Sequence, residues 1–502
     1  MQVEPAFDDF ARAHDSGEPQ LVWTRLVSDL ETPVSAFLKL AGSRENAFLL
    51  ESVEGGAVRG RYSMIGFDPD LIFRAEGGSA EIARAPDLAR FQPCHEDTLA
   101  ALRRLIGESR IVVPRALPPM AAGVFGYLSY DMVRLMEALP DENPEAIRVP
   151  DAILIRPRIV TVFDAVKDEL TLVTPVRPEP GAAARAAYDR AVNRLIEVID
   201  ALDRPLDHSA ALPDVELNGA IVSNTSPAEY KAMVARAKDY IAAGDIFQVV
   251  LSQRFEAPFP LPAFSLYRAL RRVNPSPFLY HLAFSGFSLV GSSPEILVRV
   301  REDEVTIRPI AGTRPRGKTP EEDKRLGAEL LADPKERAEH LMLLDLGRND
   351  AGRVSTLGSV RVTDQFFLEH YSHVMHIVSN VVGRLREDCD PLDALAAGFP
   401  AGTVSGAPKV RAMQIIDELE KEKRGPYAGC VGYFSADGAM DTCIVLRTAL
   451  VKDGKVYVQA GAGIVADSNP ESEQQECIAK AAGVFRAADE ARRFASQAQR
   501  GQ

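Results

Sequence analysis

Apolar residues recur every three or four positions along the stretch SPAEYKAMVARAKDYIAAG, which is the spacing of an amphipathic helix. Ser226 is a favourable N-cap, Pro227 suits the first helical position, and Glu229 completes a capping box. Gly244 is expected to end this helix. The same kind of start signal recurs at Thr319-Pro320, Asp333-Pro334 and Asn469-Pro470.

Runs of β-branched and other apolar residues predict strands in the same part of the chain. They read DIFQVVLSQRF, FSLVGSSPEILVRV, VMHIVSNVVGRL, CIVLRTALV and KVYVQAGAGIV. Strands and helices do not alternate strictly, so a doubly wound fold is disfavoured. The pattern predicts an α+β protein with large, mostly antiparallel sheets.

A change of pattern near the middle of the chain predicts two domains. Residues 1–204 mix short strands and helices and end in an Ala- and Arg-rich helix. Residues 205–222 contain prolines and a glycine without a clear period, which is typical of a linker. The second domain is then expected to span residues 223–502.

The composition excludes several classes of protein. The 502 residues are 46% hydrophobic and 26% charged, which is typical of a globular protein, and the net charge is −13. A chain this acidic is not expected to use nucleic acid or a membrane surface as its main partner. The N-terminal sequence lacks signal-peptide order, and the five cysteines are scattered without CxxC spacing. We therefore expect a cytoplasmic protein without disulfides or a zinc site.

Two predicted helices carry carboxylates that are candidates for holding a cation. Glu339 lies in AEHLMLLDLGRND, a helix apolar enough to be buried, where a carboxylate needs a partner. Glu473, Glu476 and Lys480 share one face of the helix NPESEQQECIAKA. Mg²⁺ prefers few protein carboxylates and keeps other oxygen ligands. The alternatives are a salt bridge for Glu339 and a solvated face with an ion pair for the second helix.

Small residues mark two further candidate sites. In QAGAGIVADS, Gly461 and Gly463 follow a strand, and a backbone without Cβ atoms allows close approach of a ligand. A dinucleotide fingerprint is rejected because the helix signal comes only later. In GTVSGAPK, Thr403 precedes a helix starting near Pro408, whose free N–H groups can hold an anion. A plain turn and an ordinary N-cap are the alternatives.

Two strand residues carry chemistry of their own. His376 in VMHIVSNVV is a candidate for proton transfer, with a satisfied core histidine as the alternative. Arg447 in CIVLRTALV needs a carboxylate or phosphate partner, from the protein or from a substrate. The residues alone therefore predict an α+β enzyme that acts on a small anion, with Mg²⁺ as the candidate cofactor.

Taken together, the motifs resemble the chorismate-utilising enzymes, and among them the members that form anthranilate in the first step of tryptophan biosynthesis. The matching stretches follow the family's order and include FQVVLSQ, GSSPEILVRV, PIAGTRPRG, EHLMLLDLGRND, GTVSGAPK, MDTCIVLRT and GAGIVADSNPESEQQE. The resemblance implies two large, mostly antiparallel β-sheets packed as a sandwich and flanked by helices. It also implies that the second domain holds the active site.

The resemblance gives roles to the candidate residues. Glu339 and Glu476 would hold Mg²⁺, with Glu473 beside them, and the metal would grip a substrate carboxylate. His376 would act as general acid toward the leaving ring hydroxyl, with Thr403 and Gln248 beside the reaction. The residues implied to contact chorismate are Gly312, Thr313, Tyr427, Arg447, Gly461, Ala462, Gly463 and Lys480.

Two positions discriminate between members of the family. The water-adding members carry a lysine base where this chain has Gln248, and an amide cannot deprotonate water. The members that make 4-amino-4-deoxychorismate carry a lysine where this chain has Ala311. The resemblance therefore implies direct addition of ammonia to the ring and loss of pyruvate, which gives anthranilate.

Partners also follow from the resemblance. The chain has no Gly-x-Cys-x-Gly setting, so ammonia is expected from a separate glutamine amidotransferase subunit in a hetero-oligomer. The tryptophan feedback site would consist of Glu51, Ser52, Pro277, Phe278 and Leu279.

The sequence disfavours three other functions. Aminodeoxychorismate synthase component I is disfavoured by Ala311, and an inactive tryptophan-sensing subunit by the joint presence of the catalytic candidates. An unrelated metal hydrolase is disfavoured because the sequence has no HExxH or DxD cluster.

Overall fold

The computed structural model describes residues 2–42, 44–54, 58–179, 181–206, 220–371 and 374–495. Its helices and 3-10 turns (η) are α1 (Phe7–Asp15), α2 (Pro33–Ala41), α3 (Thr98–Glu108), η1 (Pro119–Ala121), η2 (Tyr130–Leu135), α4 (Ala184–Leu202), α5 (Pro227–Ala242), α6 (Ala263–Val273), α7 (Pro320–Ala332), α8 (Pro334–Gly352), α9 (Pro391–Gly398), η3 (Gly402–Val404), α10 (Lys409–Leu419) and α11 (Pro470–Ala495).

The strands of residues 1–204 are β1 (Gln20–Val27), β2 (Ala47–Glu54), β3 (Val58–Glu76), β4 (Ser79–Arg84), β5 (Asp87–Pro93), β6 (Gly123–Leu128), β7 (Ala152–Asp164) and β8 (Glu169–Val176). Those of the remaining chain are β9 (Val222–Ser223), β10 (Gln248–Pro258), β11 (Phe278–Phe284), β12 (Phe287–Ser293), β13 (Ile296–Arg301), β14 (Glu304–Ile307), β15 (Ile310–Pro315), β16 (Arg361–His370), β17 (Val374–Arg384), β18 (Gly406–Ala407), β19 (Cys430–Ser435), β20 (Met440–Ile444), β21 (Thr448–Lys452) and β22 (Lys455–Ile464).

The predicted helix starts are confirmed. Ser226 and Glu229 form the reciprocal capping box at the start of α5, which satisfies two backbone N–H groups that the helix cannot. The side chains of Thr319 and Asp333 cap α7 and α8. Asn469 accepts hydrogen bonds from the N–H groups of the first turn of α11.

The prediction of an α+β fold with antiparallel strands is confirmed, because the pairings among the described strands are antiparallel. The described strands join into one hydrogen-bonded network, so the predicted sandwich is not resolved into two separate sheets and stays a prediction. The long strands β3 and β7 contribute to this continuity. They pair along most of their length with a shift of register between Pro69 and Leu71, so the sheet bends there without separating.

The two predicted domains share this network. Strand β2 pairs with β11, and β6 pairs with β19, so strands from residues 1–204 extend sheets formed by the later part of the chain. Most of the predicted linker, residues 207–219, lies outside the described residues. The division into two domains therefore stays a prediction.

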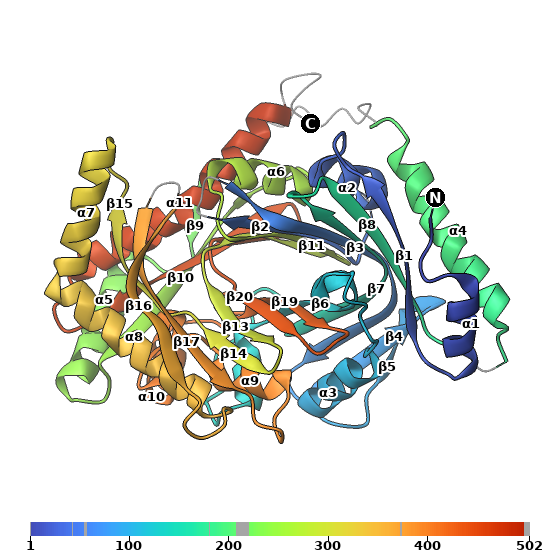
Figure 1. The fold of residues 1–502 in the computed structure, drawn as a ribbon. Helices are drawn as coiled ribbons and strands as arrows, with labels where there is room; N and C mark the ends of the chain where they lie inside the picture. Colours follow the sequence, from blue (N-terminus) through green and yellow to red (C-terminus); the bar gives the residue numbers. More distant parts are fainter. Residues whose placement is uncertain are drawn as a thin grey trace.

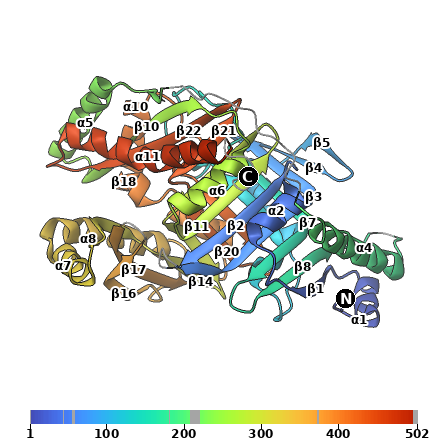
Figure 2. The same cartoon turned by 90° about the horizontal axis from the view of Figure 1, so that it is seen from above.

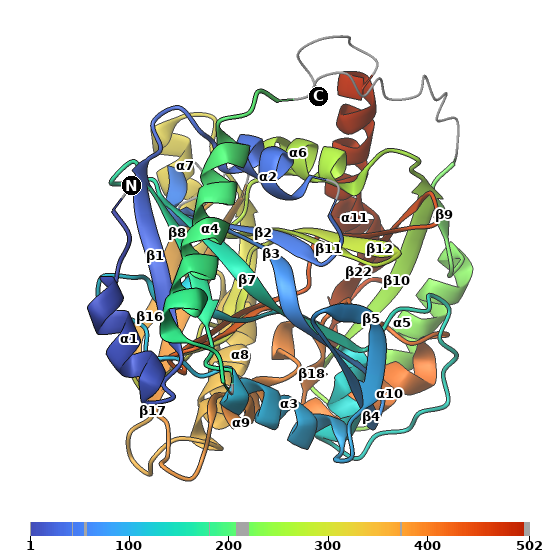
Figure 3. The ribbon, with the colours of Figure 1, turned by 90° about the vertical axis from the view of Figure 1, so that its right-hand side faces the viewer.

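Helices cover the outer faces of the network, and apolar side chains fill the interior. In Figure 1, α2 and α6 lie side by side above β2, β3 and β11, and Figure 3 shows α4 running across β1 and β8. One buried cluster joins α2, α4, α6 and α11 through residues such as Phe37, Leu195, Tyr267 and Val484. No helix in the described ranges is long and apolar enough to cross a bilayer.

Two groups of elements, which lie one above the other in the same half of Figure 2, carry many of the residues singled out from the sequence. One group contains β15, β17, α7 and α8. The other contains β10, β22, α5, α10 and α11. On one side of the network β22 pairs with β21 and β21 with β12, and on the other β20 pairs with β13. The strands β11, β2, β3, β7, β6 and β19 complete the connection between them.

Close backbone approach at Gly126 generates a prediction about stability. A Cβ atom there would collide with the carbonyl oxygen of Ile153 on the neighbouring strand β7, whereas a Cβ at Gly107 in α3 meets nothing. Gly126→Ala should destabilise the fold by about 2 kcal/mol or more, as overpacking of a core does. Gly107→Ala is the matched control and should leave the thermal midpoint unchanged or slightly raised. Equal midpoints for both variants would contradict this packing.

Candidate active site

The ladder between β10 and β22 forms one wall of the candidate site. Val250 pairs with Gly463, and Ser252 pairs with Gly461. A Cβ at Gly463 would meet Nε2 of Gln248, and a Cβ at Gly461 would meet the hydroxyl of Tyr427. A side chain at Gly461 would also meet the carbonyl oxygen of Leu251, whereas one at Gly463 would have to displace the end of the Gln248 side chain. The predicted residues Gln248, Tyr427, Gly461 and Gly463 are thus brought together.

Gln248 is buried at the start of β10, with 3% of its surface exposed. Its side-chain oxygen has no hydrogen-bond partner among the described residues. A buried amide oxygen without a partner is costly in a finished protein interior. This atom is therefore available to a ligand that brings a donor. Ala462, between the two glycines, is fully buried and faces away from them.

The opposite wall comes from β15 and β17. Thr313 pairs with His376, and Nδ1 of His376 lies 3.1 Å from Oγ1 of Thr313 and 3.0 Å from the carbonyl oxygen of Gly312. Gly312 has φ +73°, a left-handed conformation that favours glycine, at a shift of register beside Ala311. Ala311 is buried and pairs with Ile377, so it packs within the sheet.

His376 is neutral at physiological pH in this environment. Burial lowers its pKa to about 4, against a hydrogen bond to Gly312 that acts to raise it, while the charges of Arg447 and Lys480 lower it further. Because a carbonyl only accepts, Nδ1 carries the proton that it donates to Gly312. The other ring nitrogen is then an acceptor. As a general acid, His376 would first have to gain a proton.

Glu295 is a candidate catalytic residue that the sequence reasoning missed. It follows β12 in the stretch SSPEIL and is 7% exposed, and Oγ1 of Thr403 donates a hydrogen bond of 2.9 Å to its carboxyl group. Burial raises the pKa of Glu295 to about 8, although Thr403, Arg447 and Lys480 act to lower it. The signal in the sequence was a lone acidic residue after a proline inside an apolar run.

Arg447 does not lie within a strand as its alternating pattern predicted. The run CIVLRTALV is broken between β20 and β21, and Arg447 has φ +48° at the break. Burial lowers the pKa of Arg447, while Tyr371 and Glu295 act to raise it. No hydrogen bond or ion pair to its guanidinium is found within the described ranges. A buried guanidinium without a protein partner is suited to an anionic ligand.

Lys480 links α11 to the glycine run. Its ammonium group donates to the carbonyl oxygen of Gly461 at 2.9 Å and forms an ion pair of 2.7 Å with Glu476. This ion pair is the helix-surface pair that the sequence offered as an alternative, and both side chains are 47% exposed. The hydrogen bond from Lys480 to Gly461, in contrast, places a positive charge at the wall formed by β22.

The predicted acidic residues lie within electrostatic range of one another. The pKa of Glu339 is raised by burial and by the charges of Glu336 and Glu476, and that of Glu473 by burial and by Glu476. Glu339 lies on α8 and Glu476 on α11, so two helices from opposite sides of the site contribute.

The prediction that the helix around Glu339 is buried on nearly all of its faces is wrong, because Leu341 is 49% exposed.

Within the part of the chain that the structure describes, no three His, Cys, Asp or Glu side chains gather closely enough to hold a metal by themselves. A cation held by two carboxylates and by ligand oxygens would not require such a cluster. The charges of Glu336 and Glu476 act to raise the pKa of Glu339, and a divalent cation bound beside Glu339 would oppose this effect. The donor set therefore fits Mg²⁺, which prefers carboxylate and water oxygens.

The residues predicted to bind tryptophan lie on the paired strands β2 and β11. Ser52 pairs with Phe278, Glu51 pairs with Leu279, and Pro277 precedes the strand. The carboxylate of Glu51 is already bound by the side chains of Arg271 and Tyr267, at 2.6 Å from Nε of Arg271. Hence Glu51 is a fixed part of the interface between β2 and α6.

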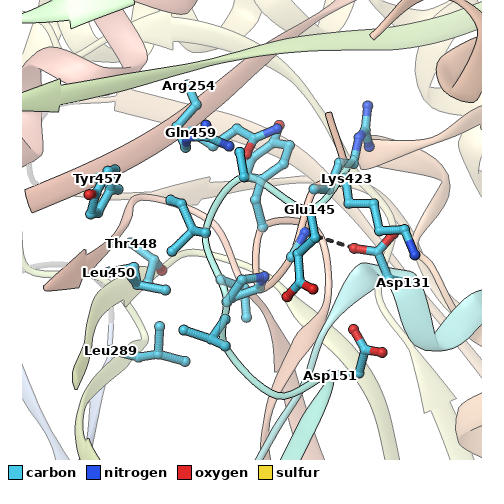
Figure 4. A pocket seen from close by; sticks show the side chains of 18 residues that line it. Asp131, Glu145, Asp151, Arg254, Leu289, Lys423, Thr448, Leu450, Tyr457 and Gln459 are labelled. Carbon is cyan, nitrogen blue, oxygen red and sulfur yellow. Dashed lines mark hydrogen bonds between the residues drawn. The ribbon is translucent and has the colours of Figure 1, made fainter. Parts of the chain in front are cut away.

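A separate cavity is lined in part by Tyr427. Figure 4 shows Asp131, Glu145, Asp151 and Lys423 on one side of it, facing Leu289, Leu450 and Tyr457. Thr448, the neighbour of Arg447, also lines it. Of the residues predicted to contact substrate, only Tyr427 lines this cavity. Tyr427 therefore borders both this cavity and the glycine run.

Similarity to known proteins agrees with this geometry. A family model described as "chorismate binding enzyme" matches residues 45–486, which include every candidate site residue. The chain belongs to the chorismate-binding enzymes. The resemblance seen in the sequence motifs is thus confirmed for the family.

Two relatives cover almost the whole chain. The chain is 56% identical over 498 residues to "Anthranilate synthase component 1" of Cereibacter sphaeroides, covering 99% of this chain and 100% of that protein. It is 46% identical over 470 residues to the protein of the same name from Aquifex aeolicus, covering 93% and 94%. The more specific resemblance to the anthranilate-forming members is confirmed by these matches.

Solved structures share the fold. The crystal structure of anthranilate synthase component I from Streptococcus pneumoniae TIGR4 matches with a TM-score of 0.76 and 37% identity, covering 92% of this chain and 99% of that one. A menaquinone-specific isochorismate synthase from Escherichia coli matches with a TM-score of 0.70 at 20% identity, covering 96% of this chain and 98% of that one. The second match concerns the fold alone.

Proposed function

We propose that this chain aminates chorismate with ammonia and eliminates pyruvate, giving anthranilate in the first step of tryptophan biosynthesis. The observation that carries the proposal is the 56% identity, over 99% of the chain, to a relative named anthranilate synthase component 1. The candidate site supports the same reaction, because it contains an anion-binding group, Arg447, and a proton-donating group, Glu295.

Chorismate would lie between the two walls of the site. Arg447 suits one substrate carboxylate, because its planar guanidinium is buried and has no partner within the described residues. The glycine run would allow close approach of the substrate to β22, with Lys480 and Tyr427 at its edge. Gly312 and Thr313 would contact the substrate from the opposite wall.

Amination is favoured over hydration by Gln248. Its amide has no basic pKa, so it cannot remove a proton from water, whereas ammonia is a nucleophile without activation. The buried, unpaired oxygen of Gln248 suits a donor such as ammonia. Ala311 is buried and chemically inert, so no enzyme amine competes for the ring carbon.

Glu339 and Glu476 would hold Mg²⁺, with Glu473 beside them. When bound there, Mg²⁺ would supply a positive charge that grips and polarises a substrate carboxylate. The chain's own contribution is to keep these carboxylates on two separate helices, where their repulsion favours binding of a cation.

Proton delivery to the leaving ring hydroxyl would fall to Glu295. A carboxyl group with a pKa near 8 is protonated at neutral pH, and transfer of its proton lets the hydroxyl leave as water. The hydroxyl of Thr403 would then stabilise the carboxylate that remains. His376, neutral and held by Gly312, would orient the substrate through its free ring nitrogen.

The wider organisation follows the same proposal. Ammonia would come from a separate glutamine amidotransferase subunit in a hetero-oligomer. Residues 223–502 would carry the reaction, and residues 1–204 would bring Glu51 and Ser52 to a tryptophan-binding region completed by Pro277, Phe278 and Leu279.

A direct assay tests the reaction. The purified chain, mixed with chorismate, Mg²⁺ and ammonium at alkaline pH, should form anthranilate, which is followed by its fluorescence. Omitting ammonium should abolish the product. Chromatographic detection of 4-amino-4-deoxychorismate, or of isochorismate, in place of anthranilate would refute the proposed reaction.

The pH dependence tests Glu295. If the protonated carboxyl group is the donor, the rate should fall as pH rises through about 8, once each rate is expressed per concentration of free ammonia. Glu295→Gln should lower turnover by about 10² to 10⁴-fold and remove that alkaline limb. An unchanged limb in this variant would show that another group donates the proton.

Metal binding tests the acidic residues without relying on activity. Mn²⁺ titrated into the protein and followed by electron paramagnetic resonance should bind at least about tenfold more weakly to Glu339→Gln and Glu476→Gln. A protonated carboxyl group does not bind a metal ion, and the pKa of Glu339 is raised. As pH is lowered, the Mn²⁺ affinity should therefore begin to fall at pH values above the ordinary pKa of a glutamate.

Glu471→Gln is the matched control for these variants. Glu471 lies on the first turn of α11 and pairs with Lys231, outside the proposed set. Its Mn²⁺ affinity should equal that of the unmodified chain. Equal affinities in all three variants would remove Glu339 and Glu476 from the metal site.

A further inference from the structure

The loop between α10 and β19 contains a buried ion pair that the proposed reaction does not use. Arg424 is 4% exposed and Glu420 is 6% exposed. Nε of Arg424 donates to one carboxylate oxygen of Glu420 at 2.9 Å, and Nη2 donates to the other at 2.6 Å. This is the bidentate arrangement in which a guanidinium and a carboxylate fit best.

The remaining N–H groups of Arg424 reach two separate parts of the main chain. Nη1 donates to the carbonyl oxygen of Val404 at 2.7 Å, and Nη2 donates to that of Val250 at 2.8 Å. Val404 adjoins Thr403, which bonds Glu295, and Val250 lies two residues after Gln248 on β10. One guanidinium therefore joins the turn behind Glu295 to the strand that carries Gln248.

Glu420 and the ring of Tyr427 extend the same network. Glu420 accepts from the backbone N–H of Ser252 at 2.8 Å and from its hydroxyl at 2.9 Å. Ser252 is the partner of Gly461 in the β10–β22 ladder. The guanidinium carbon of Arg424 lies 5.5 Å from the ring centre of Tyr427, within the range of a cation–π contact.

The cost of this pair argues for a role beyond stability. Two buried charges lose hydration, and apolar residues of the same volume would stabilise a fold at least as well. A planar guanidinium, however, fixes several acceptors at once in defined directions, which a lysine cannot do. That is the property needed to hold groups of an active site in register.

We infer that Arg424, oriented by Glu420, is a positioning residue for the chorismate site: it fixes the Thr403 turn, the Gln248 strand and the Tyr427 ring relative to one another. The inference rests on the proposed function.

The chain offers a matched control in Arg156. This residue is 6% exposed and forms a similar pair with Asp70, at 2.7 Å from Nε and 3.1 Å from Nη2, in the N-terminal half. Arg156→Lys and Arg424→Lys both keep a positive charge but lose the planar guanidinium that makes the bidentate pair. Thermal melting of both variants measures the loss of stability that the exchange causes by itself.

Arg424→Lys should lower kcat/KM for chorismate by about 10- to 100-fold, mostly in kcat, because small misplacements of reacting groups cost that much. Arg156→Lys should stay within about threefold of the unmodified chain. The alkaline limb of the rate profile should also move to higher pH in Arg424→Lys. The reason is that Thr403 acts to lower the pKa of Glu295, and this bond weakens when the turn is released.

Equal kinetic losses in the two variants, or an unmoved alkaline limb in a folded Arg424→Lys, would overturn the inference. Should Arg424→Lys fail to fold, Glu420→Asp decides the question with the same readouts, because it keeps the charge and shifts the guanidinium. A fall of kcat with a moved limb supports the inference, and unmodified kinetics overturn it. If the unmodified chain makes no anthranilate, the proposed function fails instead.

Discussion

The antiparallel ladder between β10 and β22 brings together segments that are far apart in the sequence, and the arrangement of the site depends on it. Its register pairs Val250 with Gly463 and Ser252 with Gly461, which leaves the side chain of Gln248 close to Gly463. Helix α11 follows β22 directly, so the same ladder fixes where Glu476 meets the rest of the site. Backbone hydrogen bonds hold these positions, and they leave the side chains free for chemistry.

Burial then determines the charge state of each group. At the candidate site, desolvation keeps Glu295 protonated and His376 neutral at neutral pH, and Arg447 is a buried cation without a partner in the described chain. A neutral acid beside a fixed cation can release a proton while the cation holds an anionic substrate. The walls of the site thus divide proton donation and anion binding between different residues.

Interactions between neighbours in the sequence could largely be predicted, whereas the packing of strands distant in the sequence could not. The capping residues at Ser226, Thr319 and Asp333 were predicted because their hydrogen bonds involve neighbours in the sequence. The break at Arg447 and the importance of Glu295 were missed, because they depend on which distant strands surround them. The same limit explains the sheet, since the bend of β3 with β7 depends on pairing that no local pattern encodes. The more detailed site assignments came from resemblance to a family.

The strand exchange between the two halves constrains how the chain can be divided. With β2 removed, β11 would expose one full edge, and without β6 the same would hold for β19. Unpaired edges of this kind recruit strands from other molecules. The stretches before residue 204 and after residue 223 therefore share paired strands, and we expect either half made alone to be prone to aggregate. For protein engineering, recombination of relatives should exchange β2 with β11, and β6 with β19, as complete pairs.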